Sequence, residues 1–260
     1  MSPLFHIQNL SFSYGKNSVF ADIQLKLQRG TFYGLIGANG SGKSTLLELL
    51  TGGLSATSGS IKLKDRAINS YSKQELACRI ALVPQHFSMD FEYSVRDVVL
   101  MGRHPHIPRF SVPAEKDYKK VEKAMATMDI TKLASRPVSA LSGGELQRVV
   151  MARAFAQDTE ILILDEATSN LDINHTIGIL RVIREMVNEN GLTVVAAIHD
   201  LNLAAAFCDK CVILQDRKIA ANADVNSVFT KEMLLDVFGV EVENISQTKQ
   251  NRPQIQFKYN

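Results

Sequence analysis

An α/β fold with a mostly parallel sheet is predicted for this chain of 260 residues. Short apolar runs at residues 161–164, 194–198 and 211–214 have the length of buried strands. Residues 177–190, between the first two runs, have helical spacing of their apolar side chains. Strands that alternate with helices form parallel sheets covered on both faces. A hydrophobic content of 45% is sufficient for a packed core and excludes a mainly disordered chain.

Charge and cysteine content exclude other classes of protein. The 29 basic and 27 acidic residues leave a formal net charge of +2, which argues against a nucleic-acid binder that works by bulk charge. No apolar run approaches the roughly 18 residues that cross a bilayer, and the first ten residues do not resemble an export signal. Three cysteines are too few for a disulfide framework and indicate a reducing compartment. We therefore expect a soluble cytosolic protein.

The first sixty residues are predicted to be mainly strands. Ile23, Leu25 and Leu27 alternate with polar residues, which is the pattern of a half-buried strand. An apolar run at residues 33–36 leads into a glycine-rich turn and a helix over residues 43–50. This order places the glycines between a strand and a helix.

Helices and loops are predicted from about residue 87 to residue 151. Ser94 and Asp97 form a capping-box pattern that opens a helix at residues 95–101, and helical spacing returns at residues 115–128. A short strand is expected before this stretch, at residues 80–83.

The tail after Gly239 is polar. Within it Ile255, Phe257 and Tyr259 alternate with polar residues, which predicts a small hairpin. The sequence contains no internal repeat and no low-complexity segment.

The glycine-rich turn fits the G-x-x-x-x-G-K-[ST] pattern of a phosphate-binding loop. Its backbone N–H groups and the following helix N-terminus attract phosphate oxygens. Lys43 is expected to reach the β- and γ-phosphates and the Ser44 hydroxyl to ligate Mg²⁺. The alternative is a turn without a ligand, and the spacing disfavours a dinucleotide-binding Rossmann fold. The candidate nucleotide-binding residues here are Gly37, Asn39, Gly40, Ser41, Gly42, Lys43, Ser44 and Thr45.

Two carboxylates follow the apolar run at residues 161–164. Carboxyl ends of parallel strands present ligand sites, so Asp165 suits the water-mediated shell of Mg²⁺. Glu166 suits a base for the water that attacks the γ-phosphate, or a group that orients this water. Strand ends also carry acidic residues that only face solvent, but the Lys43 loop favours the catalytic interpretation.

A second candidate phosphate site starts at Ser142. Ser142 and Glu145 form a capping-box pattern for a helix over residues 145–156, but this leaves Gly143 and Gly144 unexplained, because glycine weakens a helix. Glycines suit a place where backbone amides approach an anion closely. Since one nucleotide already has its loop, we expect this turn to face a nucleotide held by another copy of the chain.

With these motifs the sequence resembles the ATP-binding cassette ATPases of membrane transporters. Leu-Ser-Gly-Gly-Glu at residues 141–145 is the most specific motif of that family. The resemblance implies a P-loop NTPase fold with a RecA-like core, an N-terminal antiparallel β subdomain and an inserted helical subdomain at about residues 87–151. The ATP-binding domain would span residues 1–239, followed by a tail at residues 240–260.

The resemblance also implies roles for further residues. Tyr14 matches the aromatic residue that stacks on adenine, although an ordinary strand tyrosine is the alternative. Gln85 matches the glutamine that contacts Mg²⁺ or the attacking water and links to the permease, and His199 matches the histidine at the γ-phosphate. Residues 169–172 match the loop that crosses the dimer interface.

The implied assembly is a head-to-tail homodimer around two ATP molecules with Mg²⁺. It would lie peripherally on the cytoplasmic face of the inner membrane with two permease subunits, and hydrolysis would drive transport. Residues 94–106 and 199–206 are similar to ATPases of bacterial importers of iron–siderophore complexes, haem and vitamin B12. Such importers also use a periplasmic or lipoprotein binding protein, and no nucleic-acid partner is implied.

Other interpretations are weaker. A P-loop kinase or GTPase does not need the turn at residues 142–145, and a cassette acting on ribosomes or DNA generally has two cassettes or a long insertion. His104 and His106 lack a third metal ligand in sequence. Cys208 and Cys211 have the spacing of a redox or zinc pair, but lack a second pair and are expected to be small buried residues.

Overall fold

The computed structural model describes residues 2–89, 91–168 and 171–258. Contacts between Cα atoms divide the chain into two compact units. One unit combines residues 1–71 with residues 193–260, and the other is the continuous stretch of residues 72–192.

The unit that contains both chain ends has an antiparallel sheet with the strand order β2-β1-β4-β5. As predicted, Ile23, Leu25 and Leu27 are buried while the residues between them are exposed. The alternation buries one face of the sheet and leaves the other polar. The strands are β1 (Phe5–Tyr14), β2 (Asn17–Leu27), β4 (Ser58–Leu63) and β5 (Arg66–Ala67).

The same unit contains strands in the order β10-β9-β3-β8, of which β9, β3 and β8 are parallel and β10 is antiparallel. The parallel strands are almost entirely buried, as strands covered by helices should be. The strands are β3 (Phe32–Gly37), β8 (Thr193–Ala197), β9 (Lys210–Gln215) and β10 (Lys218–Asp224). The helices are α1 (Lys43–Thr51), α7 (Leu201–Phe207), α8 (Val225–Val228) and α9 (Lys231–Phe238), with a 3₁₀ turn at Ile68–Ser70.

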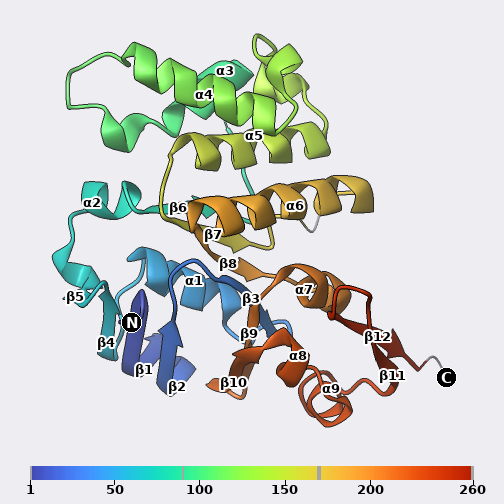
Figure 1. Ribbon diagram of the computed structural model, residues 1–260. Coiled ribbons are helices and arrows are strands. Elements are labelled where there is room, and N and C mark those ends of the chain that lie inside the picture. Colours follow the sequence, from blue (N-terminus) through green and yellow to red (C-terminus); the bar gives the residue numbers. More distant parts are fainter. Residues whose placement is uncertain (1, 90, 169–170, 259–260) are drawn as a thin grey trace. The chain divides into compact units, whose positions relative to one another are not determined.

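The predicted C-terminal hairpin is confirmed. Strands β11 (Val242–Gln247) and β12 (Pro253–Phe257) pair antiparallel, and Figure 1 shows them beside α7. Ile255 is buried, whereas Tyr259, the last residue of the predicted alternation, lies outside the described residues.

The unit of residues 72–192 has two parallel strands and most of the long helices. The strands are β6 (Ile80–Val83) and β7 (Ile161–Asp165). The helices are α2 (Lys73–Ala77), α3 (Val95–Met101), α4 (Glu115–Thr127), α5 (Gly143–Ala156) and α6 (Ile173–Asn190). Short 3₁₀ turns lie at His104–His106, Thr131–Leu133 and Val138–Ala140. Together with the other unit, this confirms the α/β prediction.

Two helix starts show how capping sets the boundaries. The predicted box before α3 is present, because the Asp97 backbone N–H donates to Ser94 Oγ at 3.2 Å and the Ser94 N–H donates to Asp97 Oδ2 at 3.3 Å. Helix α6 begins at Ile173, so the predicted start at residue 177 was wrong. The missed signal is Asp172, whose carboxylate accepts the His175 N–H at 2.9 Å and caps the helix.

A glycine and a buried ion pair join α3 to its neighbours. A Cβ atom on Gly102 would lie 2.2 Å from the Arg153 carbonyl oxygen of α5, so only glycine fits. The next residue, Arg103, is buried with its Nε 3.0 Å from Asp117 Oδ1 of α4 and its Nη1 2.7 Å from the Ala156 carbonyl oxygen. A buried charge needs such partners to offset its desolvation.

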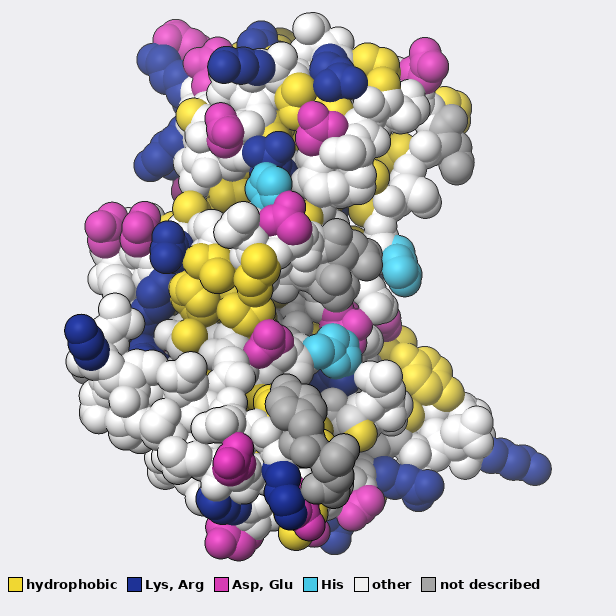
Figure 2. Space-filling view, turned by 90° about the vertical axis from the view of Figure 1, so that its right-hand side faces the viewer, with side chains coloured by type: hydrophobic (Ala, Val, Ile, Leu, Met, Phe, Trp, Pro, Cys, Tyr) yellow, Lys and Arg dark blue, Asp and Glu magenta, His cyan; other side chains and the backbone are white. Residues whose placement is uncertain are grey.

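The surface carries mixed charge. On the face drawn in Figure 2, described Lys and Arg side chains are interspersed with Asp and Glu side chains. This agrees with the small net charge of the sequence. Within the described ranges, none of the helices combines the length and the apolar character needed to cross a membrane.

We predict opposite effects for two glycine-to-alanine changes in residues 72–192. Gly102→Ala should lower the free energy of unfolding by about 1–3 kcal/mol, because the new methyl group overlaps the Arg153 carbonyl. Gly178→Ala, on the exposed face of α6 with no described atom within 4 Å of its Cβ, should raise it by up to about 1 kcal/mol. Urea unfolding of both variants measures the difference, and a Gly102→Ala protein as stable as its parent would contradict the tight contact.

Candidate functional site

The predicted phosphate loop has the expected strand–loop–helix geometry. Strand β3 ends at Gly37 and helix α1 begins at Lys43, with Gly42 as its N-cap at φ 98°. A Cβ atom would lie 2.6 Å from the Leu214 carbonyl oxygen at Gly37 and 2.8 Å from Phe20 Cζ at Gly42. Glycine is therefore required at both ends of the loop, by close backbone approach at Gly37 and by conformation and space at Gly42.

Lys43 points its ammonium group back into this loop. The residue is 5% exposed, and Nζ donates to the carbonyl oxygens of Gly37 at 3.0 Å and Ala38 at 3.3 Å. The first-turn amides of α1 lack intrahelical acceptors and carry partial positive charge. Within the described part of the chain, the buried Ser41 Oγ has no hydrogen-bond partner. Donors, a cation and an unsatisfied hydroxyl make this loop a fitting site for a phosphate group.

The strand register brings His199 to the same edge of the sheet. In the parallel pair β3–β8, Leu35 lies opposite Ala197, and the Ile198 N–H donates to the Leu35 carbonyl at 3.3 Å. His199 thus leaves its strand where the phosphate loop begins. Tyr14 lies at the end of β1, 49% exposed.

In residues 72–192, a hydrogen bond joins two predicted catalytic residues. Val83 and Leu164 are partners in the parallel pair β6–β7, so Gln85 and Glu166 both lie two residues beyond a paired position. Gln85 Nε2 donates to Glu166 Oε2 at 2.7 Å. Asp165, the last residue of β7, directly precedes Glu166. We did not predict the hydrogen bond, although the equal distance of both residues from the ends of two apolar runs was a usable signal.

Glu166 has an uncommon backbone conformation. Its φ is 50°, a left-handed value that is unusual for a residue other than Gly, Asn or Asp. Such conformations cost free energy and concentrate at functional sites. The residue that follows is also held, because Gln147 Nε2 of α5 donates to the Ala167 carbonyl oxygen at 2.5 Å. We did not assign Gln147 a role, and its position one turn after Gly143 was the available signal.

The turn before α5 has the predicted capping box. The Glu145 N–H donates to Ser142 Oγ at 3.3 Å, and the Ser142 N–H donates to Glu145 Oε2 at 2.8 Å. This backbone hydrogen bond holds the pKa of the Glu145 carboxyl below its ordinary value. A Cβ atom on Gly143 would meet no described atom within 4 Å, and one on Gly144 would meet only Leu171 Cδ2, at 3.6 Å. Packing inside the described chain therefore does not explain the two glycines.

Several other residues that the sequence singled out lie in structural contacts or in the core. His106 Nε2 lies 2.7 Å from the Gln157 carbonyl oxygen. Cys208 and Cys211 are fully buried, and burial raises the pKa of the Cys211 thiol to about 12. In the loop predicted to cross a dimer interface, residues 169–170 lie outside the described residues and Asp172 caps α6.

Sequence comparison places the chain among known proteins. A family model described as ABC transporter matches residues 20–169. The hemin import ATP-binding protein of Thermobifida fusca is 42% identical over 95% of this chain and 86% of its own length. The ferric enterobactin transport ATP-binding protein of Escherichia coli is 36% identical over 90% of this chain and 86% of its own length. Cobalamin import ATP-binding proteins of Halobacterium salinarum are 39% identical over 91% of this chain, which spans only 59% of their length.

Solved structures agree with these matches. A chain from a metal-chelate type ABC transporter in an inward-facing conformation has a TM-score of 0.85 and 32% identity, with 100% of this chain and 98% of that chain covered. A dimeric ATP-binding cassette, MJ0796, bound to ADP and phosphate has a TM-score of 0.75 and 25% identity, with 85% and 98% covered. Its family, its relatives and its fold therefore agree: this chain belongs to the ATP-binding proteins of the ABC transporter family.

Proposed function

We propose that this protein hydrolyses ATP to drive an importer of metal chelates, with an iron–siderophore complex, haem or cobalamin as cargo. The observation that carries the ATPase proposal is the buried Lys43 ammonium in a loop whose ends admit only glycine. The cargo class is supported by relatives named for hemin, ferric enterobactin and cobalamin.

Nucleotide binding is assigned to the phosphate loop and the first turn of α1. Lys43 donates to the β- and γ-phosphates, and the loop amides and Ser41 Oγ supply further donors. The exposed ring of Tyr14 stacks on adenine. The residues that surround the phosphates are Gly37, Asn39, Gly40, Ser41, Gly42, Lys43, Ser44 and Thr45.

Hydrolysis is assigned to Glu166 as base. A water oxygen attacks the γ-phosphorus, its proton passes to the Glu166 carboxylate, and the bond to the β–γ bridging oxygen breaks to give ADP and phosphate. The hydrogen bond from Gln85 orients this carboxylate, and His199 donates to a γ-phosphate oxygen. Ser44, Gln85 and Asp165 have the oxygen donors that suit Mg²⁺, which when bound offsets the phosphate charge.

A second copy of the chain completes each nucleotide site in this proposal. The amides of Gly143 and Gly144, with Ser142 Oγ, face the γ-phosphate held by the other copy's Lys43 loop, and Glu145 keeps the turn in shape. The open space at the Gly143 Cβ position supports this arrangement. The matched cassette MJ0796 is itself described as dimeric with ADP and phosphate.

The remaining assignments follow from the family. We propose a nucleotide-binding domain over residues 1–239 and a helical subdomain at about residues 87–151 that contacts the permease. Two permease subunits hold the dimer at the cytoplasmic face of the inner membrane, and a periplasmic or lipoprotein binding protein delivers the cargo. Co-purification from membranes with a multi-span partner tests this assembly.

Glu166→Gln is predicted to bind ATP and fail to hydrolyse it. The amide oxygen can still accept from Gln85, but it cannot take the water proton, so kcat should fall by at least about 10²-fold. ATP binding and phosphate release measure the two steps. The matched control is Glu160→Gln, which removes an acid paired with Arg79 at 3.4 Å just before β7. Turnover by Glu166→Gln at the parent rate would remove Glu166 from the central role.

Mixing two inactive variants tests the shared site. Lys43→Ala removes one half of each nucleotide site and Ser142→Arg obstructs the other, so each variant alone should be inactive. A mixed dimer keeps one intact site, so an equimolar mixture with random pairing should recover about a quarter of the parent ATPase rate. A mixture as inactive as its two components would contradict sites shared between copies.

A further inference from the structure

We propose that the C-terminal hairpin, residues 242–257, holds helix α7 in place and thereby positions His199. The inference rests on the proposed contact of His199 with the γ-phosphate. Asn202 and Arg252 are the positioning residues.

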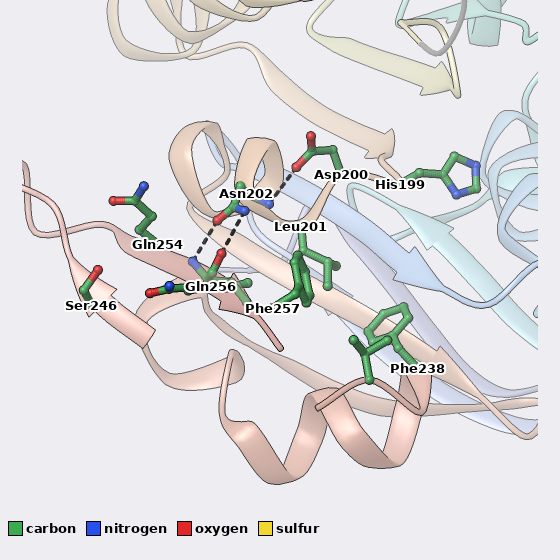
Figure 3. Close-up of a pocket in the computed structure, with 11 residues that line it drawn as sticks. His199, Asp200, Leu201, Asn202, Phe238, Ser246, Gln254, Gln256 and Phe257 are labelled. Atoms are coloured by element: carbon green, nitrogen blue, oxygen red, sulfur yellow. Dashed lines mark hydrogen bonds between the residues drawn. The ribbon is translucent and has the colours of Figure 1, made fainter. Parts of the chain in front are cut away.

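Asn202 joins the first turn of α7 to strand β12. Its Nδ2 donates to the Ile255 carbonyl oxygen at 3.1 Å, and the Ile255 N–H donates to Asn202 Oδ1 at 2.8 Å. Figure 3 shows both bonds running from the side chain to the strand. The amide group thus occupies the donor and acceptor of one strand residue, as a neighbouring strand would. Two such bonds fix both the distance and the register of the hairpin against the helix.

Arg252 holds the other end of α7. Its Nη1 donates to the carbonyl oxygen of Cys208, the C-cap residue, and its Nη2 lies 3.8 Å from Asp209 Oδ1. A cation stabilises the carbonyl end of a helix, where the last C=O groups lack intrahelical donors. Asp209 in turn accepts the Phe32 N–H of β3 at 2.9 Å. The hairpin is therefore hydrogen-bonded to both ends of α7. Through Asp209 it is also linked to β3, the strand that leads into the phosphate loop.

His199 directly precedes Asp200, the N-cap residue of α7, and only Asp200 and Leu201 separate it from Asn202 in sequence. Asp200 caps α7, because its Oδ1 accepts the N–H groups of Asn202 at 2.8 Å and Leu203 at 3.0 Å. The backbone at His199 and Asp200 is thereby fixed to the turn that Asn202 anchors. In Figure 3 the His199 ring and the Asp200 carboxylate point in different directions.

On the side that faces the hairpin, the first turn of α7 borders a cavity. A space of about 910 Å³ is bordered by His199 to Asn202 on one side and by Phe238, Val240 and the hairpin on the other. Side chains that face each other across this space do not pack together, although α7 and β12 are themselves in contact. On the opposite side α7 is close to β3, since a Cβ atom on Gly34 would lie 3.0 Å from Cys208 Sγ. Loss of the Asn202 bonds should therefore let the first turn of α7 move toward the cavity.

The consequence is a defect in turnover rather than in binding. A displacement of about 1 Å at a reacting group is enough to slow a reaction strongly. The proposed nucleotide contacts of the Lys43 loop and of Tyr14, in contrast, include no residue of α7. We expect Asn202→Leu, which removes both bonds to Ile255, to lower kcat about tenfold with the Kd for ATP unchanged. Arg252→Met should act in the same direction.

The experiment compares Asn202→Leu with Lys258→Met. The control removes an exposed ion pair of 2.7 Å between Lys258 and Glu241 at the base of the same hairpin, and it should leave kcat unchanged. Single-turnover hydrolysis and equilibrium ATP binding are measured for both, alone and combined with His199→Ala. Because Asn202 acts through His199, Asn202→Leu should add no further loss in the His199→Ala protein. An equal fractional loss in both backgrounds, or an unchanged kcat, would overturn the inference.

Two further variants distinguish a failure of the hairpin's role from a failure of the role of His199. If Asn202→Leu does not fold, Asn202→Asp keeps the acceptor for the Ile255 N–H but replaces the donor to the Ile255 carbonyl with a negatively charged oxygen that repels it, and the NMR signal of the His199 ring must shift for the inference to stand. If His199→Ala hydrolyses ATP at the parent rate, the proposed role of His199 fails, and the inference fails with it. If His199→Ala is impaired and Asn202→Leu is not, the proposed role of the hairpin is refuted and the proposed role of His199 stands.

Discussion

The buried ammonium of Lys43 is the interaction on which this account depends. A cation that is 5% exposed needs compensation, and the Gly37 and Ala38 carbonyl oxygens accept hydrogen bonds from it. Glycines at positions 37 and 42 allow the loop to close around it, and the buried strand β3 sets where the loop begins. In the proposed site, a phosphate group would place negative charge next to this ammonium group. Sequence, loop shape and charge therefore point to the same ligand.

The other chemical groups take their places from parallel strand register. Leu35 opposite Ala197 brings His199 to the edge where the Lys43 loop starts, and Val83 opposite Leu164 aligns Gln85 with Glu166. In each case two residues distant in sequence become neighbours because their strands end together. The turn at Ser142 differs, since no packing contact among the described residues requires its two glycines. The proposed contact with a phosphate held by another copy would account for them.

Most elements and the phosphate loop could be predicted, because local signals decide them. The capping box at Ser94 and the G-x-x-x-x-G-K-S spacing are read within a few residues. The start of α6 was missed because Asp172 was assigned to a loop, although it is an ordinary N-cap. The bonds from Gln85 to Glu166 and from Asn202 to Ile255 join residues 81 and 53 positions apart, and side-chain pairing at that range depends on the folded topology.

The central claim is that each ATP molecule is bound by two copies of the chain. The most direct measurement is a crystal structure of the Glu166→Gln protein with ATP and Mg²⁺. The account predicts that each γ-phosphate contacts Lys43 of one copy and the Ser142–Gly143–Gly144 turn of the other. A structure in which one copy alone supplies both groups to the same nucleotide would contradict it.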